Sequence, residues 1–209
     1  MNAPMHEWGA GRDQAVLAVL AVHGRGQDPA FMAETSRRFG PAPVRFFAPQ
    51  AEGNTWYPLS FLEPIERNEP ALSRSLGVLE SSLDALDEAG FPPGRVVLWG
   101  FSQGACLAAQ LMLTSPRALA GLVLFTGGYI GTTPPPLPQD DRLRGVPALL
   151  RSIEHDPWVP KHRVEETAGL LRAAGLKVDV RIDPGDEHII TNEACESATK
   201  LLAALAVGG

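Results

Sequence analysis

The segment Gly100-Phe101-Ser102-Gln103-Gly104 places a serine between two glycines, one two residues before it and one two residues after it. An apolar run precedes the segment and a helix-forming run follows it, so Ser102 falls on a predicted strand-to-helix turn. A turn sharp enough to expose a serine hydroxyl leaves no space for side chains at those two positions, and glycine meets this demand. The spacing predicts that Ser102 is a nucleophile.

A serine hydroxyl is a weak nucleophile at neutral pH, and it needs a histidine base that is oriented by a carboxylate. In open parallel sheets that carry such a serine, the acid follows a later strand and the histidine follows the last one. Asp156 comes directly after a predicted strand, and His188 lies between the last predicted strand and the final helix. We therefore expect Ser102, Asp156 and His188 to form a catalytic triad.

Other titratable residues fit these roles less well. An isolated Asp-Pro pair such as Asp156-Pro157 is often only a turn, but its place between Ser102 and His188 favours the acid. The weaker candidates for the acid lie within the last strand, after it, or beside the base: Asp179, Asp183, Asp186 and Glu187. The histidines without a matching role, expected in an exposed loop or a first helical turn, are His155 and His162.

The tetrahedral intermediate of acyl transfer carries an oxyanion that needs two backbone N–H donors. One is expected at Gln103, the residue after the nucleophile, and the other at Arg25 in the glycine-rich turn over residues 23–27. His23 ends the preceding strand and is expected to be structural. The same turn lacks the length of a phosphate-binding loop, and Pro29 stands where a dinucleotide motif has glycine, so nucleotide binding is disfavoured.

Aromatic and apolar residues in predicted loops are candidates for a substrate pocket, because they lie off the periodic faces that build a core. Packing beneath a loop explains each of them equally well. The candidates are Trp56, Tyr57, Phe61, Ile130 and Trp158, with Leu62 in the same setting.

Short apolar runs alternate with helical stretches along the chain, which predicts an α/β fold with a mostly parallel sheet and helices on both faces. Strands are predicted over residues 15–22, 44–48, 95–99, 121–125, 147–153 and 178–182, and helices over 69–89, 103–113, 162–174 and 190–205. The proline-rich stretch 128–139 must be a loop, so no large cap is expected. We expect one domain over residues 1–209, with 1–14 peripheral.

Composition argues against several classes of protein. The 209 residues include 24 acidic and 18 basic ones without a dense basic cluster, so nucleic acid is an unfavourable partner. The longest apolar run, 15–22, is far shorter than the roughly 20 residues of a membrane span, and with no leader-like N-terminus we expect a cytoplasmic protein. Cys106 and Cys195 show no metal-type spacing and are expected to be reduced, buried thiols. No metal and no cofactor is expected, and a homodimer is one state that the sequence allows.

The chain resembles the phospholipase/carboxylesterase branch of the α/β-hydrolases, which includes bacterial carboxylesterases and acyl-protein thioesterases. The matching stretches span residues 23–26, 54–57, 100–105, 156–160 and 185–188, and Gly-Phe-Ser-Gln-Gly-Ala over 100–105 is the most specific. The resemblance implies a serine esterase or thioesterase with the triad and oxyanion donors named above. The chain departs from the family at Ile153, where glycine is usual, and at Glu187, where a less charged residue is often found.

We therefore expect hydrolysis of a carboxylic ester with a small or medium acyl group, through an acyl-enzyme on Ser102. The alternatives are an acyl thioesterase, an acyltransferase in which an alcohol or peroxide replaces water, and a protein that keeps the fold and binds a small molecule without turnover.

Overall fold

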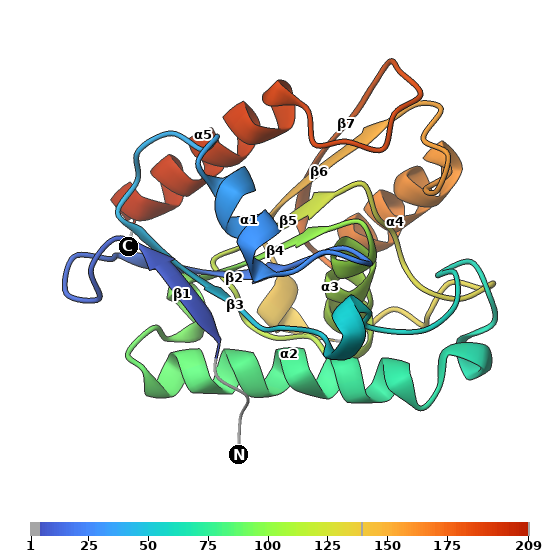
Figure 1. The fold of residues 1–209 in the computed structure, drawn as a ribbon, viewed down its shortest axis with the longest axis horizontal. Coiled ribbons are helices and arrows are strands. Elements are labelled where there is room, and N and C mark those ends of the chain that lie inside the picture. Colours follow the sequence, from blue (N-terminus) through green and yellow to red (C-terminus); the bar gives the residue numbers. More distant parts are fainter. Residues whose placement is uncertain (1–4, 139, 209) are drawn as a thin grey trace.

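The computed structural model describes residues 5–138 and 140–208, and a seven-stranded sheet runs through it (Figure 1). The strand order is β1-β3-β2-β4-β5-β6-β7. Six strands are mutually parallel and β1 is antiparallel to β3. The strands are β1 (His6–Gly9), β2 (Leu17–Val22), β3 (Val44–Ala48), β4 (Val96–Phe101), β5 (Gly121–Phe125), β6 (Pro147–Ile153) and β7 (Lys177–Asp183).

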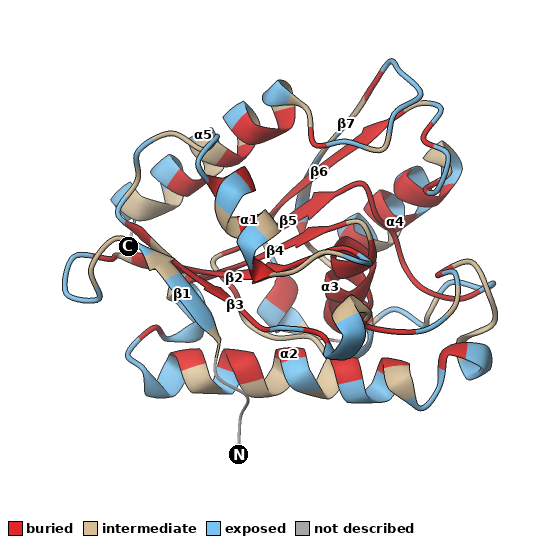
Figure 2. Cartoon of the chain, in the orientation of Figure 1, coloured by how far each residue is buried: buried red, intermediate tan, exposed pale blue. Residues whose placement is uncertain are grey.

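All six predicted strands are present, and the predicted α/β class with a mostly parallel sheet is confirmed. Every residue of β2, β4 and β5 is buried, as Figure 2 shows by their colour. Strands covered on both faces have no solvent side, so their sequences are continuous apolar runs. This is why the central strands could be read from the sequence.

Helices cover both faces of the sheet (Figure 1). On one face, α2, α3 and α4 enclose the larger apolar core, which includes Leu20, Leu98 and Leu79. On the other face, α1 and α5 enclose a second core around Val19, Trp99 and Met32. The helices are α1 (Pro29–Ser36), α2 (Ala71–Glu88), α3 (Gln103–Thr114), α4 (Lys161–Ala173) and α5 (Asn192–Gly208), with short 3-10 turns at Glu52–Asn54, Ile65–Asn68, Pro93–Arg95 and Asp141–Leu143.

Two elements were missing from the sequence prediction. Strand β1 is four residues long and mostly exposed, too short to show periodicity, although residues 1–14 were expected to be only peripheral. A cross-strand side-chain contact stabilises its pairing with β3, because Trp8 lies opposite Phe46 and stacks on it with ring centroids 5.4 Å apart. Helix α1 has almost no apolar stripe, but Asp28 caps it by accepting from the Phe31 N–H at 3.0 Å, and Pro29 occupies its first turn. The Asp28-Pro29 pair is the one sequence signal that marks the start of this helix.

The segment between β5 and β6 contains no α-helix in its described residues, which fits the predicted loop over 128–138; Gln139 lies outside the described residues. None of the helices in the described ranges combines the length and the apolar character that a bilayer crossing requires.

The parallel sheet determines where the candidate site residues meet. The carboxyl ends of neighbouring parallel strands lie at one edge of the sheet, where ligands collect in open α/β folds. Strand β4 ends at Phe101, β6 at Ile153 and β7 at Asp183. The loops that carry Ser102, Asp156 and His188 therefore leave the sheet on the same side.

Candidate active site

Ser102 sits on the sharp turn between β4 and α3, with a left-handed backbone at φ 53° and ψ −119°. Such a conformation is strained for a residue with a side chain. The turn is as crowded as the glycine spacing predicts: a Cβ on Gly104 would lie 2.1 Å from the Val22 carbonyl oxygen, and one on Gly100 would lie 2.5 Å from the Gly104 carbonyl oxygen. Both contacts are with backbone, which cannot move aside.

A chain of hydrogen bonds links Ser102, His188 and Asp156. Ser102 Oγ lies 2.8 Å from His188 Nε2, and His188 Nδ1 lies 2.7 Å from Asp156 Oδ2. Because a carboxylate only accepts, Nδ1 carries the proton and donates to Asp156, which leaves Nε2 to accept from the serine hydroxyl. Residues separated by up to 86 positions are brought together. Ser102, His188 and Asp156 lie where a nucleophile, a base and an acid are expected to lie relative to one another.

Asp156 is held by its own turn as well as by His188. Its other oxygen, Oδ1, accepts from the backbone N–H groups of Trp158 at 2.8 Å and Val159 at 2.9 Å. The Asp156 side chain is fully buried, and three donors compensate its charge. These bonds fix the orientation of the carboxylate towards the imidazole.

Three of the other candidate acids and bases are occupied elsewhere, whereas His155 and His162 are exposed. His23 is fully buried, its Nδ1–H donates to the Gly24 carbonyl oxygen at 2.8 Å, and its Nε2 accepts from the Ala51 N–H at 3.1 Å. Burial lowers the pKa of His23, so a structural, neutral imidazole is favoured. Asp183 pairs with Arg181, and Asp179 pairs with Arg151. Among the described residues no three His, Cys, Asp or Glu side chains are grouped so as to hold a metal ion.

The two expected oxyanion donors both border the cleft above Ser102. Gln103 is the first residue of α3, and its N–H has no acceptor within the helix. The turn that carries Arg25 passes beside the serine, because a Cβ on Gly24 would lie 3.2 Å from Ser102 Cβ. The turn is held at this place by the Gly26 N–H, which donates to the Asn54 carbonyl oxygen at 2.7 Å.

The side chains of the same two residues hold the cleft wall over residues 56–59, a role that the sequence did not reveal. Arg25 Nη1 and Nη2 donate to the carbonyl oxygens of Pro58 and Leu59 at 2.8 and 2.6 Å. Gln103 Oε1 accepts from the Trp56 N–H at 3.0 Å, while its Nε2 donates to the Tyr57 carbonyl oxygen at 2.7 Å. Each residue therefore connects a segment that carries an expected oxyanion donor to the cleft wall.

A cleft of about 480 Å³ opens in front of Ser102 and His188. Three predicted pocket residues line it: Tyr57, Phe61 and Trp158. Trp56 and Ile130 do not line it. The Trp56 indole N–H donates to the His23 carbonyl oxygen at 2.8 Å, and Ile130 is fully buried beside α3, where its N–H donates to Gln110. Both side chains are part of the buried apolar core instead.

Cys106 lines the cleft, although its place in the sequence predicts only a buried thiol. It lies four residues after Ser102, so one helical turn places both on the same side of α3. The thiol is free and buried, as expected, and the Gly128 N–H approaches its sulfur at 3.4 Å. Burial raises the pKa of Cys106 to about 12, which keeps the sulfur protonated and unreactive.

The fold and the site together define an α/β-hydrolase. A family model described as phospholipase/carboxylesterase matches residues 7–206, so the chain belongs to this family, as its motifs predicted. A curated relative is acyl-protein thioesterase 1 of Schizosaccharomyces pombe, 29% identical over 192 residues that cover 84% of this chain and 85% of that protein.

Solved structures give the same result. The chain superimposes on a phospholipase/carboxylesterase from Dyadobacter fermentans with a TM-score of 0.88 and 29% identity, over 95% of both chains. Esterase PE8 matches with a TM-score of 0.76 over 97% of this chain and 98% of that one, and at 24% identity it supports the fold alone.

Proposed function

We propose that this protein is a serine hydrolase that cleaves carboxylic esters, with Ser102, His188 and Asp156 as its triad. The observation that carries the proposal is the unbroken hydrogen-bond chain of 2.8 and 2.7 Å from Ser102 through His188 to Asp156. Membership of the phospholipase/carboxylesterase family supports the same reaction class.

In the first half-reaction, Ser102 Oγ attacks the ester carbonyl carbon while His188 Nε2 takes the hydroxyl proton. The carbonyl oxygen becomes an oxyanion that accepts from the N–H groups of Arg25 and Gln103. When the tetrahedral intermediate collapses, the bond to the leaving alcohol breaks and His188 returns the proton to that oxygen. The acyl group remains on Ser102.

In the second half-reaction, water takes the place of the alcohol. His188 removes a proton from the water as its oxygen attacks the acyl carbon, and the same two N–H groups stabilise the second oxyanion. Collapse breaks the bond to Ser102 Oγ, His188 gives the proton back to the serine, and the carboxylic acid leaves. Asp156 orients the imidazole throughout and stabilises its charged form.

The cleft suggests where the two halves of the substrate bind. Tyr57, Phe61 and Cys106 are buried and form an apolar wall, which suits the acyl chain. Trp158 is 70% exposed and belongs to the turn that carries Asp156, on the His188 side of the cleft. Because His188 must protonate the departing oxygen, we assign the Trp158 indole to the leaving group.

The test is labelling with a fluorophosphonate probe together with hydrolysis of a p-nitrophenyl ester series of increasing acyl length. Replacing Ser102 with alanine should abolish labelling and reduce turnover by at least about a thousandfold. Ser73→Ala, on the exposed face of α2, is the matched control and should retain both. Rates should fall on acidification, because a protonated imidazole cannot accept the serine proton. Esterase activity that survives Ser102→Ala would refute the mechanism.

A thioesterase is the second candidate, favoured by the acyl-protein thioesterase among the relatives. The same residues serve both reactions, so the comparison is between kcat/KM for acyl thioesters and for oxygen esters of the same acyl group. Competing alcohols added to the assay reveal acyl transfer as a new ester product. A protein that binds the ester but fails to label would be a binding protein instead. The cytoplasmic location stays a prediction.

A further inference from the structure

Strand β7 is the last strand of the sheet beside β6, and its outer backbone groups face away from the sheet. Lys177 N–H donates to Val146 O at 2.9 Å, and Glu154 N–H donates to Asp183 O at 2.9 Å, so the odd-numbered residues of β7 bond to the β6 side. By the alternation of a strand, the N–H and C=O groups of Val178, Val180 and Ile182 point outwards.

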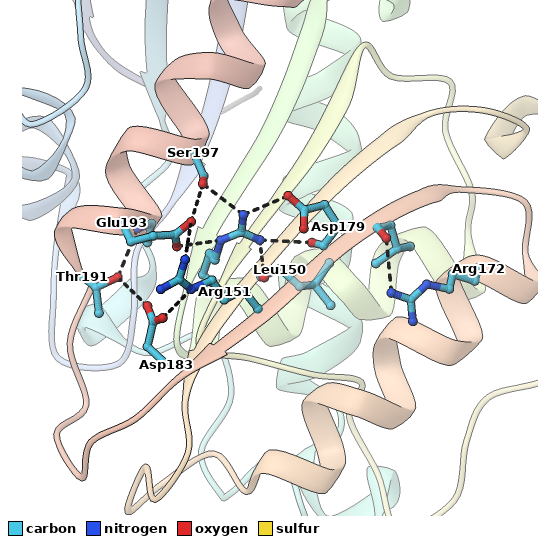
Figure 3. Close-up of polar contacts among 11 residues, drawn as sticks. Leu150, Arg151, Arg172, Asp179, Asp183, Thr191, Glu193 and Ser197 are labelled. Atoms are coloured by element: carbon cyan, nitrogen blue, oxygen red, sulfur yellow. Dashed lines mark hydrogen bonds and ion pairs between the residues drawn. The ribbon is translucent and has the colours of Figure 1, made fainter.

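The two faces of β7 differ sharply in chemistry. Val178, Val180 and Ile182 pack against the core on the α4 side. The opposite face carries Lys177, Asp179, Arg181 and Asp183, which alternate in charge along the strand. Figure 3 shows Asp179 turned towards Arg151 and α5, in agreement with the 2.9 Å ion pair. The side chains of Asp179 and Arg181 remain 68% and 57% exposed.

We propose that β7 pairs antiparallel with β7 of a second copy of this chain, about a twofold axis at Val180, to form one continuous sheet. In this register Lys177 faces the partner's Asp183, and Asp179 faces the partner's Arg181. The outward backbone groups supply the hydrogen-bonded pairs, so the charged residues fall at the other positions, where facing side chains approach most closely. The axis repeats each contact. The contacts between Asp179 and Arg181 join side chains that are more than half exposed, whereas the Asp183 side chain is 12% exposed and also pairs with Arg181 of its own chain.

Shifting the two strands by one step of the ladder in either direction removes this match. One shift places Asp179 against the partner's Asp179 and Lys177 against the partner's Arg181. The other places Arg181 against Arg181 and Asp179 against Asp183. Like charges directly opposite each other destabilise strand pairing. Among these three registers the charge pattern favours the one about Val180, which also pairs the most charged residues, and this argues for a second copy as the occupant of this edge.

Helix α4 continues the complementarity. It contacts both β6 and β7, so two copies related by the axis would lie about 10 Å apart at a strand spacing of about 4.8 Å, a normal helix packing distance. Its exposed residues Glu165, Gly169 and Arg172 follow one another at helical spacing. In an antiparallel helix pair crossing near Gly169, Glu165 would face the partner's Arg172.

The position of Arg172 fits this crossing. Its Nη2 donates to the outward Val178 carbonyl oxygen at 3.2 Å, so the end of α4 lies level with Val178. Val180 is about 6.6 Å further along β7, which corresponds to about four residues of α4 and brings Gly169 close to the axis. On pairing, the partner's Ile182 N–H would replace Arg172 at Val178, and Arg172 would turn to the partner's Glu165.

Charged residues on an edge strand also serve to keep it unpaired. Sedimentation velocity over a micromolar concentration series separates the two roles. We expect the wild-type chain to be a dimer and Val180→Pro to be a monomer, because proline removes the central outward N–H while leaving the bonds to β6 intact. A monomeric wild type, or a dimeric Val180→Pro variant, would overturn the proposal.

A charge exchange on α4 tests the geometry without touching the sheet, and it keeps the test valid if Val180→Pro does not fold. Glu165→Arg and Arg172→Glu should each raise the dimer dissociation constant at least about tenfold, since the axis repeats each repulsion. The double variant should restore the wild-type value. Arg74→Glu, an exposed charge change on α2, is the control and should leave it unchanged. Failure of the double variant to recover would refute the helix contact and the proposed axis.

Discussion

Gln103 is the residue whose side chain makes the sharpest prediction about the cleft wall. Its amide serves two buried backbone groups at once, the Trp56 N–H and the Tyr57 C=O. Gln103→Ala would leave both without partners, and a buried group that loses its hydrogen bond costs about 1–3 kcal/mol. The two together predict a loss of about 2–6 kcal/mol in the free energy of unfolding, a large part of the 5–15 kcal/mol that is roughly typical of a domain.

Gln110, two turns along the same helix, is the natural control. It is also buried, and its side chain accepts from one backbone N–H, that of Ile130, at 2.9 Å. Gln110→Ala should therefore cost about 1–3 kcal/mol, half as much as Gln103→Ala. Urea unfolding of both variants gives the comparison directly, with the slope of the transition checked for constancy.

Measurements of KM and kcat for Gln103→Ala distinguish the role of its side chain in the cleft wall from the role of its backbone N–H as an expected oxyanion donor. Gln103→Ala keeps its backbone N–H and loses only the side-chain bonds to the wall. The variant should therefore show a raised KM with a smaller change in kcat, because the wall around Tyr57 loosens. A cost for Gln103→Ala no greater than that for Gln110→Ala would refute the idea that its side chain holds the wall. A large fall in kcat with unchanged KM would place its effect on the oxyanion instead.

Three further predictions follow from burial and crowding. Gly104→Ala should abolish folding or activity, because its Cβ would meet the Val22 carbonyl oxygen, whereas Gly77→Ala in the open middle of α2 should stabilise by about 0.5–1 kcal/mol; thermal melts distinguish them. Burial raises the pKa of Cys106 to about 12, so the folded chain should hold far less thiolate at this position than the unfolded chain. Iodoacetamide labelling followed by mass spectrometry should therefore be fast only in urea. Burial lowers the pKa of His23 from its ordinary 6.5, so on acidification the unfolded chain takes up a proton on His23 before the folded chain does. The free energy of unfolding should therefore fall as the pH drops through 6.5, and His23→Gln should flatten the pH dependence of urea midpoints.

The sequence was most informative where one physical demand dominates. Strands such as β4 are buried on both faces, and the turn at Ser102 tolerates only glycine at two positions. Both demands leave direct marks on residue type. The polarity of a parallel sheet places the loops of Ser102, Asp156 and His188 at one edge, and the structure brings their side chains into contact.

The cleft wall was harder to predict because a loop residue of a given type can either pack in the core or line the cleft. Trp56 and Tyr57 are adjacent aromatic residues in one loop, yet the first packs on His23 and the second borders the cleft. Their types and spacing are alike, and only the path of the backbone separates them. The side-chain roles of Arg25 and Gln103 depend on contacts 33 to 47 residues away, which no local pattern encodes.

In the proposed β7–β7 dimer, the shared direction of the six parallel strands determines where the two clefts open. An axis that makes β7 antiparallel to its copy reverses the direction of every strand in the second sheet. The two catalytic clefts, each at the carboxyl edge of its own sheet, would open on opposite sides of the assembly. Such a dimer could present only one mouth to a flat surface such as a lipid droplet or a bilayer. The two clefts of such a dimer would therefore have separate entrances and share no substrate path.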